Sequence, residues 1–366
     1  MDPTVTCCPK LACPARGQRG QGHMRLPSRQ ARRLLCTACH QPCAATKGTA
    51  CERRRTSVET ISLVVTLMAH GCPLQALVIA CGVDERTVAR WGTRAGVPGQ
   101  AVPEHLGAHP RALGPVQADA SRVKQPGGIV GMALAMMGQT HVWLGGAGSA
   151  PRAMPWIRRL LAWVTRGAAP RPLLVGTDGV GASLRAIRET VRAPVHTGQG
   201  GRPRLRPWRH ILLAHVVKRD ERRRGVETAR RLVDGTPARV ETRRRRSQGA
   251  GGIKTVSIER LNATCRARLA SLTRRGRALA RHTLTLQHGR SLRGAVYPFC
   301  TPHASLAPIR GGTTPAMAAG ITDHGWTVQA LLALPVPPPR WTPPTQRGRP
   351  SQALQRLIAR WCGDHG

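Results

Sequence analysis

The strongest constraint on this chain is its charge. Lysine and arginine number 57 against 17 aspartates and glutamates, which gives a formal net charge of +40. A compact fold with this excess repels itself unless a polyanion compensates, and nucleic acid is the obvious polyanion. Hydrophobic residues make up 41% of the 366 residues, which excludes a wholly disordered basic tail. At roughly 150 residues per domain, the length predicts two or three domains.

The cysteines indicate a metal-binding module and not a disulfide framework. Seven of the 12 cysteines lie between Cys7 and Cys51. The start of the sequence has no apolar core of a signal peptide. The longest apolar stretch, Ile61 to Ala69, is far shorter than the ~20 residues that cross a bilayer. We therefore expect a protein of the reducing cytoplasm, associated with the nucleoid, with a metal module over residues 1–51.

Two close pairs of thiols define the predicted metal site. Zinc tolerates a long loop between two pairs of ligands but needs each pair within one turn. The pairs are Cys8 with Cys13 and Cys36 with Cys39. The spare ligands nearby are Cys7, His40 and Cys43, and Cys7 could substitute for Cys8. The alternative is a set of reduced cysteines without metal.

Residues 56–96 have helical periodicity with the spacing of a helix-turn-helix. Gly82 suits the left-handed position of the turn, and Asp84 would cap the second helix. Arg86, Thr87 and Arg90 then point outward toward a DNA major groove. The alternative is an ordinary helical hairpin, because a turn centred on glycine is common between helices.

Proline and glycine mark residues 97–115 as a linker that cannot continue a helix, beginning at Pro98. Three apolar runs of strand length then follow from Val116, and alternating helix and strand come after them. This pattern predicts an α/β domain with a mixed sheet over residues 116–310. Within it, the strongly basic residues 218–250 look inserted. Residues 311–366 are expected to form a partly disordered tail with a short helix at 352–361.

Three carboxylates lie at the ends or inside of predicted elements. Asp119 falls in the first predicted strand, Asp178 at the end of a later strand, and Glu259 near the start of a long helix. Two Mg(II) ions about 4 Å apart need anionic oxygens from facing elements. Glu259, Asn262 and Arg266 share one arc of the helix, so a metal ligand would be followed by two groups that reach DNA phosphates. The alternative is surface acids that cap elements or pair with arginine.

From about residue 7 to about residue 332, the chain resembles bacterial insertion-sequence transposases of the DDE class. The strings that carry the resemblance are Cys8-Pro9 with Cys13-Pro14, Cys36-Thr37-Ala38-Cys39, Gln117-Ala118-Asp119, Gly176-Thr177-Asp178-Gly179, Ile258-Glu259-Arg260-Leu261-Asn262-Ala263-Thr264, Tyr297 with Pro302-His303 and Leu306, and Thr314-Pro315-Ala316-Met317-Ala318-Ala319-Gly320. The strings around Glu259 and Tyr297 are the specific ones.

The resemblance implies a zinc ribbon at 1–51, a helix-turn-helix DNA-binding domain at 56–96, and an RNase H-like integrase core. That core has a mixed five-stranded sheet flanked by helices. The resemblance also implies that Asp119, Asp178 and Glu259 are the catalytic triad and bind Mg(II) or Mn(II). The implied activity is cleavage and strand transfer of double-stranded DNA at the terminal repeats of an insertion sequence and at its target. Joining two DNA ends further implies a homo-oligomer.

The chain departs from the family at positions that are usually acidic, aromatic or asparagine-like. These positions are Ala120, Ser121, Ser257, Cys265 and Pro298. Each lost aromatic removes buried area worth roughly 2 to 4 kcal/mol in a core. The alternative function is therefore a decayed or domesticated copy that only binds DNA. A third is a nuclease or resolvase that cuts without joining.

Two weaker signals remain. Gly201-Arg202-Pro203-Arg204 and Arg347-Gly348-Arg349-Pro350 resemble AT-hook peptides, which insert arginine into a narrow minor groove. Composition alone can produce such strings. His303 would bind metal or phosphate, or would belong to a capped turn that orients the last helices.

Overall fold

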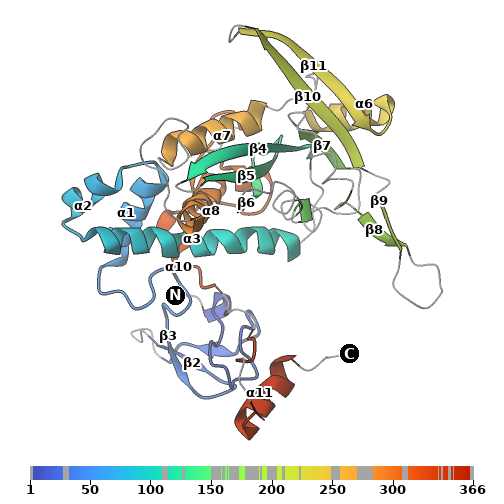
Figure 1. Ribbon diagram of the computed structural model, residues 1–366. Helices are drawn as coiled ribbons and strands as arrows, with labels where there is room; N and C mark the ends of the chain where they lie inside the picture. The colour runs from blue at the N-terminus through green and yellow to red at the C-terminus, as the bar shows by residue number, and fades with distance from the viewer. Residues whose placement is uncertain are drawn as a thin grey trace. The chain divides into compact units, whose positions relative to one another are not determined.

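The computed structural model describes residues 3–27, 33–108, 114–125, 128–149, 158, 161–162, 164, 173–177, 189, 192–195, 204–207, 211–221, 224–248, 256–269, 283–306, 312–336, 338, 341–344, 348 and 350–362. Its contacts divide the chain into two compact units (Figure 1). One unit combines Met1–Ile61 with Leu332–Gly366, and the other is Ser62–Leu331. Each unit is described by itself below.

The first unit contains a small antiparallel sheet in the order β1-β2-β3. Its elements are η1 (Pro3–Val5), β1 (Met24–Arg25), β2 (Arg33–Cys36) and β3 (Pro42–Ala44). Strands this short bury too little apolar surface to stabilise a module alone. The buried cluster of this module contains Cys8, Cys13, Cys36 and Cys43 around Leu34. Cysteine side chains therefore occupy much of the space that an aliphatic core would fill.

The end of the chain belongs to this first unit. The backbone N–H of Val336 donates to the Gly48 carbonyl at 2.8 Å, and that of Ala50 donates to the Leu332 carbonyl at 3.2 Å. Helix α11 (Gln352–Cys362) covers the short helix expected at 352–361, and its Trp361 Nε1 donates to the Leu11 carbonyl at 3.0 Å. The earlier part of the region expected as a tail belongs to the second unit up to Leu331, and it contains α9 (Pro315–Ala318) and the start of α10 (Val328–Ala333).

Three helices precede the large sheet: α1 (Val58–Ala69), α2 (Leu74–Cys81) and α3 (Glu85–Ala108). The expectation that no helix continues past Pro98 is wrong, because α3 runs through the first part of the expected linker. Helix α3 also packs against α8 (Thr283–Cys300), and tertiary packing stabilises a helix beyond its local propensity. Among the described helices, none has the length and apolar character needed to span a bilayer.

The second unit is built on a six-stranded mixed sheet in the order β11-β10-β7-β4-β5-β6. The first three strands along the chain form an antiparallel meander, β7 pairs parallel with β4, and β10 pairs parallel with β7. Their bounds are β4 (Val116–Gln125), β5 (Gly128–Met137), β6 (Trp143–Ser149), β7 (Leu173–Thr177), β10 (Ile211–Glu221) and β11 (Arg224–Asp234). The α/β class and mixed sheet are confirmed. The expected count of five strands is wrong, because β11 adds a sixth at the edge.

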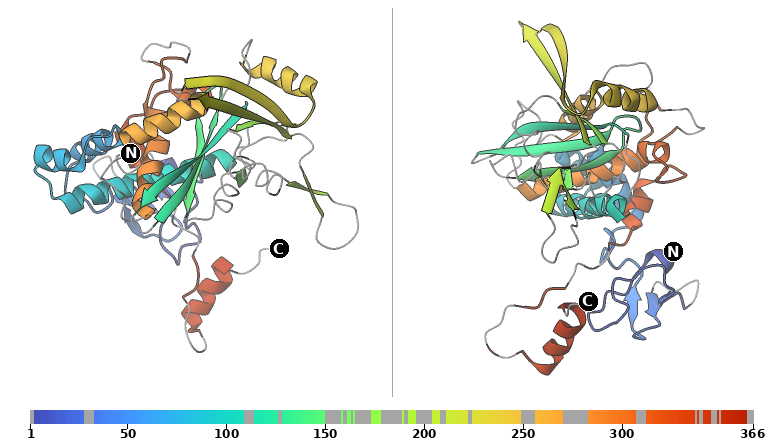
Figure 2. Two further views of the ribbon diagram at one scale, coloured as in Figure 1. Left: turned by 45° about the horizontal axis from the view of Figure 1, so that its top comes forward. Right: turned by 90° about the vertical axis from the view of Figure 1, so that its right-hand side faces the viewer.

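The basic segment expected as an insertion continues this sheet. β7 pairs with β10 only from Ile211 to His215, whereas β10 and β11 stay paired to Glu221 and Arg224. The hairpin therefore extends past the other strands (Figure 1 and Figure 2). Helix α6 (Pro237–Gln248) packs back onto the sheet through buried Val240. A separate two-stranded sheet pairs β8 (Arg192–Val195) with β9 (Arg204–Pro207).

A buried cluster joins β5 and β6 to α7 (Val256–Arg268) and α8. Ile258, Leu261 and Cys265 of α7 are buried, as their spacing predicts, and Leu269 is partly buried. Leu272, also expected on this side, lies outside the described residues. The cluster is completed by Leu134, Met136, Trp143, Leu286 and Tyr297. This core fixes α7 across β4 and β5, where the candidate carboxylate site lies.

The contact between α3 and α8 makes a testable prediction about Gly96. A Cβ at this position would lie 2.6 Å from the backbone carbonyl oxygen of His288. Gly96→Ala is therefore expected to lower the free energy of unfolding by about 1–3 kcal/mol, although alanine is the better helix former. Chemical denaturation followed by tryptophan fluorescence measures the change.

Gly92 of the same helix provides the matched control. Its Cβ would meet only the end of the Met68 side chain, with Cε at 2.4 Å, and this flexible end can move aside. Gly92→Ala is expected to be neutral or to stabilise by up to about 1 kcal/mol. Equal effects of the two substitutions would contradict a close backbone approach at Gly96.

Candidate metal centre and carboxylate site

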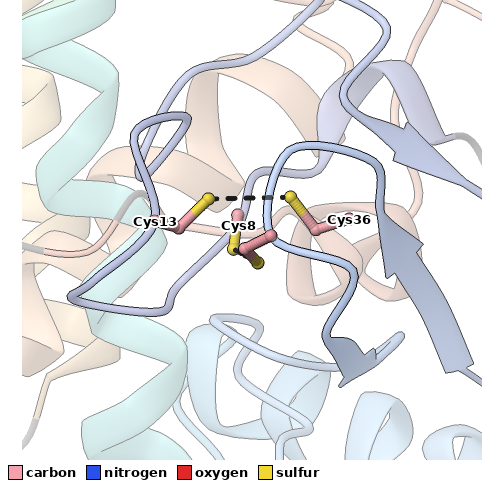
Figure 3. Close-up of side chains that lie close together, drawn as sticks. Cys8, Cys13 and Cys36 are labelled. Atoms are coloured by element: carbon pink, nitrogen blue, oxygen red, sulfur yellow. Dashed lines mark hydrogen bonds between the residues drawn. The ribbon is translucent and has the colours of Figure 1, made fainter.

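The four predicted thiol ligands lie together in the first unit. The Sγ atoms of Cys8, Cys13, Cys36 and Cys39 are all within 4.8 Å of one another. Cys8 and Cys39 are separated by 3.8 Å between sulfurs, and Cys13 and Cys36 by 3.7 Å. Figure 3 shows Cys13 and Cys36 pointing toward each other from separate loops, with Cys8 between them. A tetrahedron with Zn–S bonds of about 2.3 Å has sulfurs about 3.8 Å apart, so this four-cysteine group can bind a metal such as zinc.

Local backbone geometry forms the two loops that present the thiols. The Gly17 N–H donates to the Cys8 carbonyl at 3.0 Å, which closes the loop that contains Cys13. Cys36 ends β2, and its N–H donates to the Gln41 carbonyl at 3.2 Å. Between them His40 has a φ of 51°, in the left-handed region, so the chain reverses immediately after Cys39. Each pair is thus held by hydrogen bonds within a few residues, which is why spacing alone predicts it.

Burial affects the thiols unequally. It raises the pKa of Cys13 to about 11 and also raises that of Cys8. Burial acts in the same direction on Cys36, but backbone N–H groups of Cys39 and Ala38 donate to its sulfur and bring its pKa below the usual value. Metal must therefore displace protons from buried thiols, and its affinity is expected to fall as pH falls. The spare ligands Cys7, His40 and Cys43 are not part of the group that the structure brings together.

The turn between α2 and α3 has the predicted left-handed glycine and the predicted aspartate cap. Gly82 has a φ of 61° at the end of α2, and the Asp84 carboxylate accepts a hydrogen bond from the Thr87 N–H at 3.1 Å. Val88 and Trp91 are buried, so α3 keeps its apolar side inward. Arg86 and Arg90 are exposed and Thr87 is half-buried. The predicted DNA-facing side chains are therefore available at the surface of α3.

In the second unit, Gln117 and Asp119 of β4 both contact α7. The Gln117 side-chain oxygen accepts a hydrogen bond from the Ile258 N–H at 2.9 Å, in the first turn of the helix. The Asn262 amide donates to the Asp119 carboxylate. Residues two apart on a strand share a face, so β4 holds α7 at two points one turn apart. Glu259 lies between these points along the helix and is half-buried.

The sequence did not identify Gln117 as a site residue. It also predicted that Asn262 would reach DNA phosphates, and the structure corrects this prediction. Asn262 is only 2% exposed, so its side chain is buried against Asp119 and does not reach a DNA backbone. Its Oδ1 has no hydrogen-bond partner among the described residues. Arg266, the other predicted phosphate contact of this helix, is half-buried. The signal that could have found Gln117 is its spacing of two from Asp119 on a strand.

The third predicted carboxylate, Asp178, lies outside the described residues. The strand that leads to it is described: β7 ends at Thr177, which pairs in parallel register with Ala118. The Thr177 hydroxyl is buried, and the described part of the chain offers it no hydrogen-bond partner. The structure therefore places the end of β7 beside the residue that precedes Asp119.

The two AT-hook-like strings are largely undescribed, because residues 201–203, 347 and 349 lie outside the described residues.

Comparison with known proteins gives no further assignment. No protein-family model matches this sequence, and no curated protein has significant similarity to it.

Proposed function

We propose that this protein is a DNA transposase of the DDE class, which binds the ends of an insertion sequence and cuts and joins DNA with divalent metal ions. The observation that carries the proposal is the double contact of β4 with α7. It brings Asp119 to the helix turn that contains Glu259, although the two residues are far apart in sequence. The Oδ1 of buried Asn262, which has no hydrogen-bond partner within the described ranges, adds to the oxygen-rich character of this place.

The donor set suits a hard cation, because Mg(II) and Mn(II) prefer carboxylate and amide oxygens. Asp119, Glu259 and, by its place in the sequence, Asp178 would hold the ions. Bound there, the ions would lower the pKa of a water or hydroxyl nucleophile and stabilise the leaving oxygen. Asn262 holds the Asp119 carboxylate in one orientation. Gln117 holds the start of α7 and thereby positions Glu259.

The order of the strands supports an RNase H-like core. Counted from β6 through β5, β4 and β7 to β10, three antiparallel strands are followed by two parallel ones. This agrees with the mixed five-stranded sheet that the resemblance to DDE transposases implies, with β11 as an added edge strand. In this proposal the carboxylates gather at β4, the central strand of the five.

The DNA would be held mainly by other parts of the chain. Arg86, Thr87 and Arg90 of α3 would contact the terminal repeats, with the four-cysteine module as the zinc ribbon. The basic β10–β11 hairpin and α6 would neutralise phosphates, so binding should weaken steeply with salt. Joining two ends needs at least two copies of the chain, and a DNA-bound protein would be associated with the nucleoid.

Metal-dependent cleavage of its own flanking DNA tests the proposal. The full-length protein, kept loaded with zinc, is incubated with duplexes that carry the ends flanking its gene, with Mg(II), with Mn(II) or with neither ion added. We expect 3′ nicks at the ends, and joined products when target DNA is present, only with metal. A duplex of the same length and scrambled ends serves as the control.

The same assay separates the two alternatives. Nicking without joined products would indicate that the protein is a nuclease or resolvase and not a transposase. Binding without nicking, by protein whose circular dichroism shows a folded chain, would leave a decayed or domesticated DNA-binding protein. Either result would overturn the proposed strand transfer.

A further inference from the structure

Two histidines and a serine form a cluster that the proposed cleavage site does not use. His141 lies in the turn between β5 and β6, and His303 and Ser305 lie in the loop after α8. The two imidazole rings stack with centroids 4.5 Å apart and an interplanar angle of 21°. Ser305 Oγ lies 2.9 Å from His303 Nδ1 and 3.3 Å from His141 Nε2. One hydroxyl therefore bridges the two rings.

Backbone contacts hold both sides of this cluster. The His303 N–H donates to the Thr313 carbonyl at 3.0 Å, and the Leu306 N–H donates back to the His303 carbonyl at 3.0 Å. On the other side, the His141 N–H donates to the Met137 carbonyl at 2.9 Å. The edge of the Tyr297 ring packs near His303 at a centroid distance of 6.3 Å. Both sides of the cluster are thus held by hydrogen bonds from the backbone.

The contacts of His303 favour the tautomer in which Nδ1 is the acceptor. The Ser305 N–H lies 3.4 Å from His303 Nδ1, so this nitrogen acts as an acceptor. The Ser305 hydroxyl then donates to the same nitrogen and accepts from Nε2–H of His141. A neutral His303 with an acceptor Nδ1 carries its proton on Nε2. That N–H has no hydrogen-bond partner in the described part of the chain.

The electrostatic surroundings favour an anion. Burial, His303 and the Arg260 guanidinium together lower the pKa of His141 to about 4. Burial and Arg260 also lower the pKa of His303, so both rings are neutral donors at about pH 7. Arg260 is exposed and follows Glu259 on α7.

We propose that His303 Nε2–H and Arg260 bind a phosphodiester oxygen of DNA next to the carboxylate site. This inference rests on the proposed function and names a strand contact for it. Arg260 directly follows Glu259 on α7, so in this proposal the phosphate belongs to DNA bound close to the carboxylate site. A metal site fits less well for two reasons. The Ser305 hydroxyl already contacts Nδ1 of His303 and Nε2 of His141. In addition, no described acid or cysteine completes a group of metal ligands here.

Binding to DNA without cleavage tests this site. Full-length protein, kept loaded with zinc, is titrated into a labelled duplex carrying the DNA that flanks its gene, without added Mg(II) or Mn(II), at several salt concentrations. His303→Ala is expected to weaken binding by about tenfold, because a hydrogen bond to a charged oxygen is lost. His303→Gln keeps an N–H donor and should stay within about threefold of the unmodified protein. Arg260→Gln should lower the slope of log K against log salt by about 1.

His324 supplies the matched control. It is an exposed histidine of the same unit, and its Nδ1 lies 2.6 Å from the carboxylate of the adjacent Asp323. His324→Ala should leave DNA affinity unchanged. Nitrogen-15 spectra of the histidines add a second measurement. If His303 had only a structural role, its Nε2 resonance would not change when DNA binds. We expect His303 to be protonated at Nε2 in the free protein and its Nε2 resonance to shift on saturation with DNA.

The outcomes separate this inference from the proposed function. An unchanged His303 Nε2 resonance, or equal affinities for His303→Ala and the unmodified protein, overturns the phosphate contact but leaves transposition standing. If the alanine variant unfolds, the spectrum of the unmodified protein with and without DNA still decides. Failure of the unmodified protein to bind its flanking DNA overturns both proposals together.

Discussion

Asp119→Asn is expected to reduce metal-dependent nicking by about three orders of magnitude while leaving DNA binding unchanged. Asparagine has nearly the same shape as aspartate, and its side-chain oxygen can still accept the hydrogen bond that Asn262 donates in this structure. The substitution therefore removes charge and a potential metal ligand without opening a cavity. Gel assays of nicking, with anisotropy for binding, measure the two quantities separately.

Asp234→Asn is the control for this substitution. Asp234 ends β11, is exposed, and its carboxylate accepts a hydrogen bond from the Gly235 N–H at 2.9 Å. The same chemical change there should leave nicking within about twofold of the unmodified protein, because a surface aspartate seldom contributes to a distant site. Nicking retained by Asp119→Asn would show that any cleavage does not depend on the β4 carboxylate.

The sequence predicts those parts of the fold whose cause is local. Apolar runs of strand length mark β4, β5, β7 and the start of β10, because buried strands need such residues. β11 has no comparable signal: it is an edge strand held by backbone hydrogen bonds to β10, and its residues are mostly polar. The course of α3 past Pro98 is equally hard to predict, because proline disfavours a helix interior by local chemistry although α3 continues to Ala108.

The candidate sites divide in the same way. The four-cysteine group is predictable because each thiol pair is formed by neighbouring residues in one turn. The pairing of Asp119 with Asn262 joins positions 143 residues apart, and helical spacing identifies only the arc that holds Glu259 and Asn262. That arc does not reveal which side faces the sheet, so the sequence directs Asn262 to DNA whereas the structure buries it against β4.

Cys36→Ser is expected to remove zinc from the protein and unfold the small sheet of the first unit. The unmodified chain should contain about one zinc ion, because its four sulfurs already have tetrahedral spacing. Structural zinc supplies about 10–16 kcal/mol of apparent binding energy in small modules, and strands of two to four residues have no comparable apolar core to replace it. Zinc content by elemental analysis and near-ultraviolet circular dichroism measure the two effects.

Cys7→Ser is the informative control, because Cys7 is adjacent to Cys8 and is the ligand that could substitute for it. It lies outside the group of close sulfurs, and burial raises the pKa of its thiol. Zinc content should therefore remain about one ion in Cys7→Ser and fall below about a tenth of an ion in Cys36→Ser. Loss of zinc from the Cys7 variant would show that Cys7, and not Cys8, is the ligand. Full zinc-independent folding of the Cys36 variant would instead favour reduced thiols without metal.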